Sequence, residues 1–454
     1  MKIAFVRPNY TTYFITPPLG IGYLSSVLKK RGFQTKIFDG VCLEVSLDSL
    51  ISQVIAYSPD LICITCLSAY FEEVKYLSLK FKEKNFKVII GGVHPTFMPQ
   101  ETLIETKADF VILGEGENVL PDFLENGFDN DGLKGVYSLS DFEKKDKTIE
   151  RAPFVTNLDD IPFPDLEALN PNFYPPSPMG MVTKGYPIGV MISSRGCPCS
   201  CIYCSSSSFY EHRVRLRSAE NVVAEMKHLI ENYGVKEIQF MDDNLILNRQ
   251  HAVEICNLIL KENIKINWSC PNGIRADSLD YELAVLLKKA GCYLVTIGIE
   301  SANPQILKNV KKGETIDVIS KAIRVASKAG LIVHGAFVLG LPGETKETIR
   351  ETINFAKKLP LNRAFFTLID VLPGCELWKN DKEKYKNFLT TDSYAVPAYI
   401  PEGLTKEYLM KAQERAMFEF YFRPRILFDM IKLIRFKQLK YIFRRLLKFR
   451  LLKK

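Results

Sequence analysis

The sequence predicts an α/β protein with an N-terminal doubly wound, Rossmann-like domain, a partial (β/α)6 TIM-like barrel and a C-terminal helical extension. Two stretches of the 454-residue chain alternate short apolar runs with amphipathic helical runs, the pattern of parallel sheets covered by helices. A content of 47% apolar and 25% charged residues supplies an ample core. We predict the domains at residues 1–135, 188–375 and 376–454, with a proline-rich linker at 136–187.

The first domain contains five β-rich runs, from KIAFVRP near the start to DFVILGEGE before residue 118. Parallel sheets bind ligands where the carboxyl ends of their strands meet. The loops expected at that edge carry Ser68, Gly91, Gly92 and Glu115. Small residues there would let a bulky ligand approach the backbone, although they also suit ordinary turns.

The linker differs in composition from both neighbours, because eight prolines between residues 145 and 187 interrupt any periodic pattern. Its segments IPFPDL and NFYPP carry aromatic side chains. We therefore expect it to pack against a neighbouring domain.

The second α/β stretch contains six strand-like runs separated by helical runs, which fits an open barrel of six βα units. Barrels of this type place their chemistry at the carboxyl ends of the strands. The unusual polar residues of this half all follow predicted strands. They are the cysteines of 197–204, Asp242 and Asp243, Arg275, Glu300 and Ser301, and the turn GLPGET with Gly340 and Pro342.

Four of the eleven cysteines lie between residues 197 and 204. Cys197, Cys201 and Cys204 have C-x3-C-x2-C spacing, which lets one loop hold three corners of a 4Fe–4S cluster and leave the fourth iron open. Zinc sites usually combine two separated cysteine pairs, and disulfides are rare in a reducing compartment. Cys199 is the surplus thiol. The odd cysteine count, the absence of a signal-peptide pattern and the lack of a long apolar run predict a cytoplasmic protein.

With Tyr203 before the last cysteine, and with its place after the first strand of a six-unit array, this motif resembles the radical S-adenosylmethionine (SAM) superfamily. The resemblance implies that the open iron binds the amino and carboxylate groups of SAM. It also implies that an electron, supplied by a donor such as flavodoxin or ferredoxin, releases a 5′-deoxyadenosyl radical, which requires a water-poor barrel.

The resemblance also assigns further residues by position. Asp242 and Asp243 would meet the methionyl amino group, although a turn or capping pair is the plain alternative. The stretches GIES and GLPGET would line the carboxylate, ribose and adenine, while Thr345 would also cap a helix. Arg275 would pair with a carboxylate or form a structural ion pair.

The whole layout over residues 1–375 resembles the cobalamin-binding subfamily of these enzymes, on the segments PPLGIGYLSSVLKKRG, GGVHPTF and LGEGE. This resemblance implies that the nucleotide tail of cobalamin lies along the sheet edge at Ser68, Gly91 and Gly92. The D-x-H-x-x-G motif of other cobalamin modules is absent after the first strand, so no histidine of that loop would bind cobalt. His94 fits a loop hydrogen bond better.

The basic character of the chain is concentrated in its tail, because residues 421–454 hold 12 Lys and Arg residues against one acid, Asp429. Within 436–449, apolar and basic residues fall on opposite sides of a helix, as in helices at membrane surfaces. A helix docked on the barrel fits the same pattern. We expect a peripheral contact with the inner face of the membrane and no binding of nucleic acid.

These features predict an enzyme that methylates an unactivated carbon of a small-molecule or lipid-like substrate with SAM, a 4Fe–4S cluster and cobalamin. Cyclisation or C–C coupling on the same scaffold is the alternative. A hypothesis of another class is a non-catalytic iron–sulfur electron carrier or scaffold. Such a protein would normally complete four cysteine ligands and would not need GIES or GLPGET.

Overall fold

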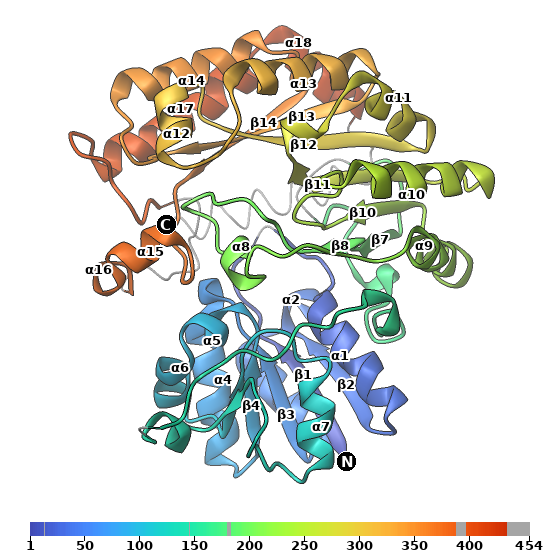
Figure 1. Ribbon diagram of the computed structural model, residues 1–454, viewed down its shortest axis with the longest axis vertical. Helices are drawn as coiled ribbons and strands as arrows, with labels where there is room; N and C mark the ends of the chain where they lie inside the picture. Colours follow the sequence, from blue (N-terminus) through green and yellow to red (C-terminus); the bar gives the residue numbers. More distant parts are fainter. Residues whose placement is uncertain (13, 145, 179–182, 387–395, 434–454) are drawn as a thin grey trace.

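The computed structural model describes the chain except for residues 13, 145, 179–182, 387–395 and 434–454 (Figure 1). Two α/β domains follow one another along the long axis of the molecule, and the chain that carries the cysteines passes between them. The predicted fold class is confirmed, since each domain is built on a parallel sheet with helices packed against it.

The N-terminal sheet has the strand order β2-β1-β3-β4-β5-β6, and only β6 is antiparallel to its neighbour. Its strands are β1 (Lys2–Arg7), β2 (Gln34–Asp39), β3 (Leu61–Thr65), β4 (Val88–Gly91), β5 (Phe110–Ile112) and β6 (Val136–Tyr137). The chain order reverses between β1 and β3, which is where open parallel sheets bind ligands. The sixth strand lies within the stretch predicted as linker, so the sheet extends one strand beyond the expected boundary at residue 135.

Helices cover both faces of this sheet. Its helices are α1 (Leu19–Lys30), α2 (Gly40–Leu43), α3 (Leu47–Tyr57), α4 (Phe71–Glu83), α5 (Val93–Phe97), α6 (Pro99–Thr106) and α7 (Val119–Glu125). Helices α3, α4 and α6 bury their apolar sides in one core, and α1 and α7 bury theirs in the other. The linker packs on this domain, because Leu158 and Ile161 contact Tyr23, and Leu169 and Tyr174 contact Ile15.

The second sheet is an open barrel of six parallel strands in the order β14-β13-β12-β11-β10-β7. Its strands are β7 (Ile188–Met191), β10 (Glu237–Phe240), β11 (Asn267–Ile274), β12 (Cys292–Glu300), β13 (Ile332–Leu339) and β14 (Arg363–Leu368). Its helices are α9 (Ala219–Tyr233), α10 (Arg249–Lys261), α11 (Tyr281–Lys289), α12 (Pro304–Asn309), α13 (Ile316–Lys328) and α14 (Lys346–Lys358). The carboxyl ends of these strands carry the predicted site residues, because Asp242, Asp243, Arg275, Glu300 and Gly340 all lie at or just past a strand end.

A C-terminal helix lies along the free edge of the last barrel strand. The hydroxyl of Tyr421 donates to the Ala364 carbonyl at 3.0 Å, and the Gln413 amide donates to the Phe366 carbonyl at 2.7 Å. The C-terminal helices are α15 (Glu376–Asn380), α16 (Lys382–Lys386), α17 (Lys406–Tyr421) and α18 (Pro424–Leu433). Among the described residues, no helix combines the length and the apolar character needed to span a bilayer. The tail helix expected at 436–449 lies outside the described residues.

A layer of polar side chains crosses the interior of the barrel at one level. Gln239, Ser269, Thr296 and His334 come from the consecutive strands β10 to β13, and each is at most 4% exposed. The residues next to them in sequence point outward into the helix-covered core. Both ring nitrogens of His334 lack a hydrogen-bond partner within the described part of the chain. Burial first, and the Arg363 charge second, lower the pKa of His334 well below its ordinary value, so its ring is neutral.

We predict that the barrel loses stability as the pH falls through about 6.5, the unfolded pKa of histidine, because the unfolded chain then binds a proton that folded His334 does not. The free energy of unfolding should fall by up to about 1.4 kcal/mol per pH unit for this one group. In His334→Gln, thermal unfolding between pH 7.5 and 5.5 should show a shallower dependence on pH than in wild type. His228→Gln on α9 is the control and should keep the wild-type slope; equal slopes in all three proteins would contradict the prediction.

Candidate functional site

The three predicted cluster ligands lie on one closed loop. The short strands β8 (Ser194–Arg195) and β9 (Arg215–Leu216) pair antiparallel, so residues 196–214 leave and return at the same place. Gly196 has a φ of 104°, and a Cβ there would collide with the carbonyl oxygen of Arg213. Only glycine lets the two chains approach this closely at the base of the loop.

The middle of the loop is fixed by backbone hydrogen bonds to later parts of the barrel. The Ile202 N–H donates to the Val310 carbonyl at 3.1 Å, and the Leu377 N–H donates to the Ile202 carbonyl at 3.0 Å. Cys201 and Cys204 lie on either side of this anchor and are partly buried. Burial raises the pKa of both thiols, so binding of metal must displace their protons.

The pair of aspartates after β10 supports this loop. Asp243 accepts from the Gly196 N–H at 3.2 Å and from the Ser206 hydroxyl at 2.6 Å, so it joins the two sides of the cysteine motif. Asp242 is only 2% exposed, and its oxygens accept from Ser193 and Ser194. Asp242 thus holds the chain just before the cysteine motif, and its predicted contact with the SAM amino group stays a prediction. The partly exposed Asp243 stays a candidate for that contact.

The donor set fits an iron–sulfur cluster better than a single metal ion. Among the described residues, no three His, Cys, Asp or Glu side chains converge on one point where an ion could be held. Three thiolates in C-x3-C-x2-C spacing on one loop are typical of a cubic cluster, in which each thiolate binds its own iron. Cys197, Cys201 and Cys204 would each hold one iron, and no histidine of the described residues joins them.

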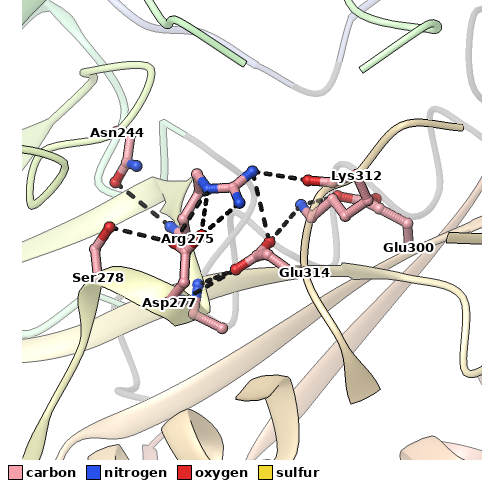
Figure 2. Close-up of polar contacts among 8 residues, drawn as sticks. Asn244, Arg275, Asp277, Ser278, Glu300, Lys312 and Glu314 are labelled. Atoms are coloured by element: carbon pink, nitrogen blue, oxygen red, sulfur yellow. Dashed lines mark hydrogen bonds and ion pairs between the residues drawn. The ribbon is translucent and has the colours of Figure 1, made fainter. Parts of the chain in front are cut away.

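A buried network of charged side chains lies at the carboxyl ends of β11 and β12, and Figure 2 shows how its members face one another. The Lys312 ammonium lies 2.9 Å from a carboxylate oxygen of Glu300 and 3.4 Å from one of Glu314. Arg275 donates to the Lys312 carbonyl at 2.9 Å and pairs with Asp277 at 2.6 Å. The predicted carboxylate partner of Arg275 is therefore a neighbour in the chain, and Arg275 holds the backbone of Lys312.

Lys312 is the most deeply buried cation of this network, with a side chain that is 7% exposed. Burial opposes its charge, but Glu300 and Glu314 outweigh burial and raise the pKa of Lys312, so it stays protonated. Its charge also acts on the Cys201 thiol. A buried ammonium whose charge reaches the cysteine loop would be able to bind the carboxylate of SAM. Lys312 was not predicted from the sequence, although the segment KKGE follows GIES after the short helix α12.

Glu300 has an unusual backbone. Its φ is 63°, which is uncommon for a residue other than glycine, and the register of β12 against β13 shifts between Gly298 and Glu300. Such a conformation costs about 1–3 kcal/mol and persists where the surrounding structure fixes it, commonly at functional sites. The bond to Lys312 fixes it here. Ser301, by contrast, is fully buried, and its hydroxyl lies 3.3 Å from that of Thr352 of α14; its predicted contact with SAM stays a prediction.

The stretch GLPGET forms a turn at the end of β13. Glu344 accepts from the N–H groups of Gly340 and Leu341, and burial raises the pKa of this carboxyl to about 8. Thr345 caps α14, as expected from the sequence. The predicted contacts of Gly340 and Pro342 with SAM would have to be made by their backbone, and they stay predictions.

A cavity of about 230 Å³ lies at the carboxyl ends of β1, β3, β4 and β5. Its walls are mainly apolar, and they include Gly91, Gly92, Gly114 and Gly116 on the side of the sheet. At Gly92, where φ is 110°, a Cβ would lie 2.7 Å from the Cys66 carbonyl oxygen. The cavity fits the flat, largely apolar base of a cobalamin tail. Ser68 does not line the cavity. Its hydroxyl lies 2.9 Å from His94 Nδ1, with which it forms a hydrogen bond.

Glu115 lines this cavity, but its carboxylate is already paired. It lies 2.9 Å from Arg195 and 2.6 Å from Arg215, both of which belong to the barrel domain. Burial opposes its ionisation, but Arg215 and Arg195 outweigh this and lower the pKa of Glu115. Glu115 therefore joins the two domains, and its predicted contact with the cofactor stays a prediction. Arg195 and Arg215 were not predicted as partners of Glu115. Their positive charges and the acidic residues that follow β5 in the N-terminal domain could have indicated such a pairing.

The fold and the site together define a radical SAM enzyme with a cobalamin-binding domain. Residues 191–356 match the radical SAM superfamily, and residues 9–124 match the B12 binding domain. The sequence is 34% identical over 422 residues to an uncharacterized methyltransferase of Pyrococcus horikoshii, covering 90% of this chain and 89% of that protein. The chain belongs to the family of cobalamin-dependent radical SAM methyltransferases and uses a 4Fe–4S cluster, SAM and cobalamin.

Two other relatives act on named substrates. The cytidylyl-2-hydroxyethylphosphonate methyltransferase of Streptomyces wedmorensis is 26% identical, and the match covers 83% of this chain and 80% of that protein. The anaerobic magnesium-protoporphyrin IX monomethyl ester cyclase of Cereibacter sphaeroides is 27% identical, with 93% of this chain and 71% of that protein covered. The family therefore includes both methyltransferases and cyclases.

Two solved structures share the fold. The radical SAM methyltransferase TsrM of Kitasatospora setae, with cobalamin and a 4Fe–4S cluster bound, superposes with a TM-score of 0.68 at 18% identity, covering 83% of this chain and 73% of that one. The cobalamin-dependent radical enzyme OxsB gives a TM-score of 0.65 at 20% identity, with coverage of 91% and 60%. These similarities confirm the two-domain α/β architecture.

We predict that Cys201→Ala abolishes the 4Fe–4S cluster and that Cys199→Ser keeps it, because only three of the four loop thiols have the spacing for the cube. The measurement is the iron and sulfide content, with the visible absorbance, after anaerobic reconstitution. Cys199→Ser is the matched control on the same loop. Loss of the cluster in Cys199→Ser, or a full cluster in Cys201→Ala, would contradict the ligand assignment.

We predict that Lys312→Gln weakens binding of SAM to the reconstituted enzyme by about tenfold or more, the loss of one charge-assisted hydrogen bond. Lys311→Gln is the control, since the neighbouring Lys311 pairs with Glu376 in an exposed position. Equilibrium dialysis with labelled SAM gives both dissociation constants, and the iron content verifies that the cluster is intact. If Lys312→Gln and Lys311→Gln bind SAM with equal affinity, the assignment of Lys312 to the SAM site is wrong.

Proposed function

We propose that the enzyme transfers a methyl group to an unactivated carbon of a small, lipid-like substrate. The observation that carries the reaction type is the 34% identical relative in Pyrococcus horikoshii, which aligns over nearly all of both chains and is named a methyltransferase. When bound, the cluster supplies an electron to SAM and the cobalamin supplies the methyl group. The electron would come from a reducing protein such as flavodoxin or ferredoxin.

The residues of the chain would prepare the site for this chemistry in three ways. The loop of residues 196–214 would hold the cluster in a partly buried position between the domains, which limits access of water to a radical. Lys312 would hold the negatively charged end of SAM. Asp243 would keep the two ends of the cysteine motif together, so that the open corner keeps one orientation.

Support for a lipid-like substrate comes from the end of the described chain. Phe418 and Phe422 are 59% and 65% exposed, and their rings stack at 4.2 Å on the surface of α17. The sequence from this point onward is strongly basic. Exposed aromatic side chains beside basic residues favour contact with anionic lipid surfaces. An enzyme at such a surface would meet apolar substrates there.

Cyclisation is the second candidate, and the relative from Cereibacter sphaeroides favours it. It would use the same cluster loop and SAM site without transfer of a methyl group. The electron-carrier hypothesis has less support, because three cysteine ligands leave one iron open and because the family consists of enzymes.

We predict that the enzyme, incubated anaerobically with a strong reductant, trideuteromethyl SAM and a lipid extract of a strain that lacks its gene, moves the label into one extract component. Mass spectrometry should show a product 17 mass units heavier than its precursor. Cys201→Ala is the control and should give no product. Formation of 5′-deoxyadenosine with an unlabelled product would favour the cyclase, and labelling only of water-soluble components would contradict the lipid-like substrate.

A further inference from the structure

One buried carboxylate holds both ends of the cysteine loop to the other domain. Glu115 bonds to Arg195 through one oxygen at 2.9 Å and to Arg215 through both oxygens, at 2.6 Å and 2.7 Å. Glu117 adds a second contact to Arg195 at 2.8 Å. All four side chains are at most 12% exposed, so water screens these charges little.

The two arginines occupy equivalent positions on the two strands at the base of the loop. Arg195 of β8 is the register partner of Arg215 of β9. The cysteine motif begins two residues after Arg195, and residues 196–214 all lie between the two partners. The direction in which this loop leaves the barrel is therefore set by a carboxylate of the N-terminal domain.

The same carboxylate belongs to the wall of the cofactor cavity. Gly114, Glu115, Gly116 and Glu117 line the cavity from the N-terminal domain. The barrel domain completes the wall with Arg195 and with Phe209 and Tyr210, which lie on the cysteine loop after the motif and the four serines that follow it. A molecule in the cavity would contact both the loop of residues 114–117 and the chain that carries the cysteines.

We propose that Glu115 is a positioning residue that makes binding of cobalamin and binding of the iron–sulfur cluster cooperative. A ligand in the cavity restricts the loop of residues 114–117, and through Glu115 this also restricts Arg195, Arg215 and the base of the cysteine loop. Binding of the first cofactor orders these segments and bears the loss of conformational entropy. The second cofactor then binds to segments that are already ordered, so its affinity is higher. By reciprocity, each cofactor raises the affinity for the other by the same factor.

The coupling is measured with the full chain, without substrate and without turnover, so it is independent of which reaction the enzyme catalyses. The dissociation constant of hydroxocobalamin is determined by equilibrium dialysis for cluster-free protein and for anaerobically reconstituted protein. We expect binding on the order of tenfold tighter to the reconstituted protein, within the range of measured allosteric couplings. In the reciprocal experiment, bound cobalamin should lower by the same factor the equilibrium constant for removal of the cluster by a chelator.

Two variants test whether Glu115 carries the coupling. Glu115→Gln removes the negative charge of the carboxylate. Arg215→Lys keeps the positive charge but removes the pair of hydrogen bonds to the two Glu115 oxygens. In both, the ratio of the two cobalamin dissociation constants should approach one. Arg217→Lys is the matched control, because Arg217 follows β9 and pairs with buried Glu225 within the barrel domain. It should keep the wild-type ratio, and thermal unfolding shows whether each variant is folded.

Three outcomes would overturn the proposal. A ratio of one in the wild-type protein would show that the two cofactors bind independently. A wild-type ratio in both folded Glu115→Gln and Arg215→Lys would place the coupling elsewhere, for example in the wall formed by Phe209 and Tyr210. An equal loss of coupling in Arg217→Lys would assign the effect to general loosening of the barrel. If Glu115→Gln does not fold, Arg215→Lys alone decides.

Discussion

Charges that have been removed from water must be paired, and in this protein that requirement joins the two domains. Arg195 and Arg215 are buried at the base of the cysteine loop, and the partners that compensate them, Glu115 and Glu117, belong to the other domain. Leaving any one of these charges unpaired would cost several kcal/mol. The barrel therefore places its metal-binding loop correctly only when the N-terminal domain is docked, and the cavity is complete only in the same arrangement.

The second charged cluster serves a different purpose. The network of Lys312, Glu300 and Glu314 lies entirely within the barrel and keeps protonated one ammonium whose charge reaches the cysteine loop. It also fixes the left-handed backbone of Glu300. The polar groups near the cluster are thus largely bonded to one another before a cofactor binds, which lowers the cost of ordering them when it does.

The fold was predictable because its signals are local. Alternating apolar and amphipathic runs indicated both parallel sheets, and C-x3-C-x2-C spacing within one loop indicated candidate ligands without knowledge of the fold. The partners of single polar residues were not predictable, because they depend on packing between distant segments. Asp242 and Ser301 follow strands, as cofactor-binding residues do, and the sequence did not indicate that Ser193 and Thr352 bond to them. Lys312 was missed because nothing in KKGE shows which lysine is buried.

The helix along the last barrel strand has a consequence for how the protein survives in a crowded cell. An open barrel leaves the N–H and C=O groups of its outermost strand ready to pair with a strand of another molecule. On β14, the side chain of Gln413 donates a hydrogen bond to the Phe366 carbonyl, and the side chain of Tyr421 donates one to the Ala364 carbonyl. A neighbouring strand would make similar bonds. If the chain is incompletely folded and α17 has not yet packed against β14, the unpaired N–H and C=O groups of β14 are exposed. A helix that is synthesised after the barrel strands thus protects their edge from intermolecular aggregation.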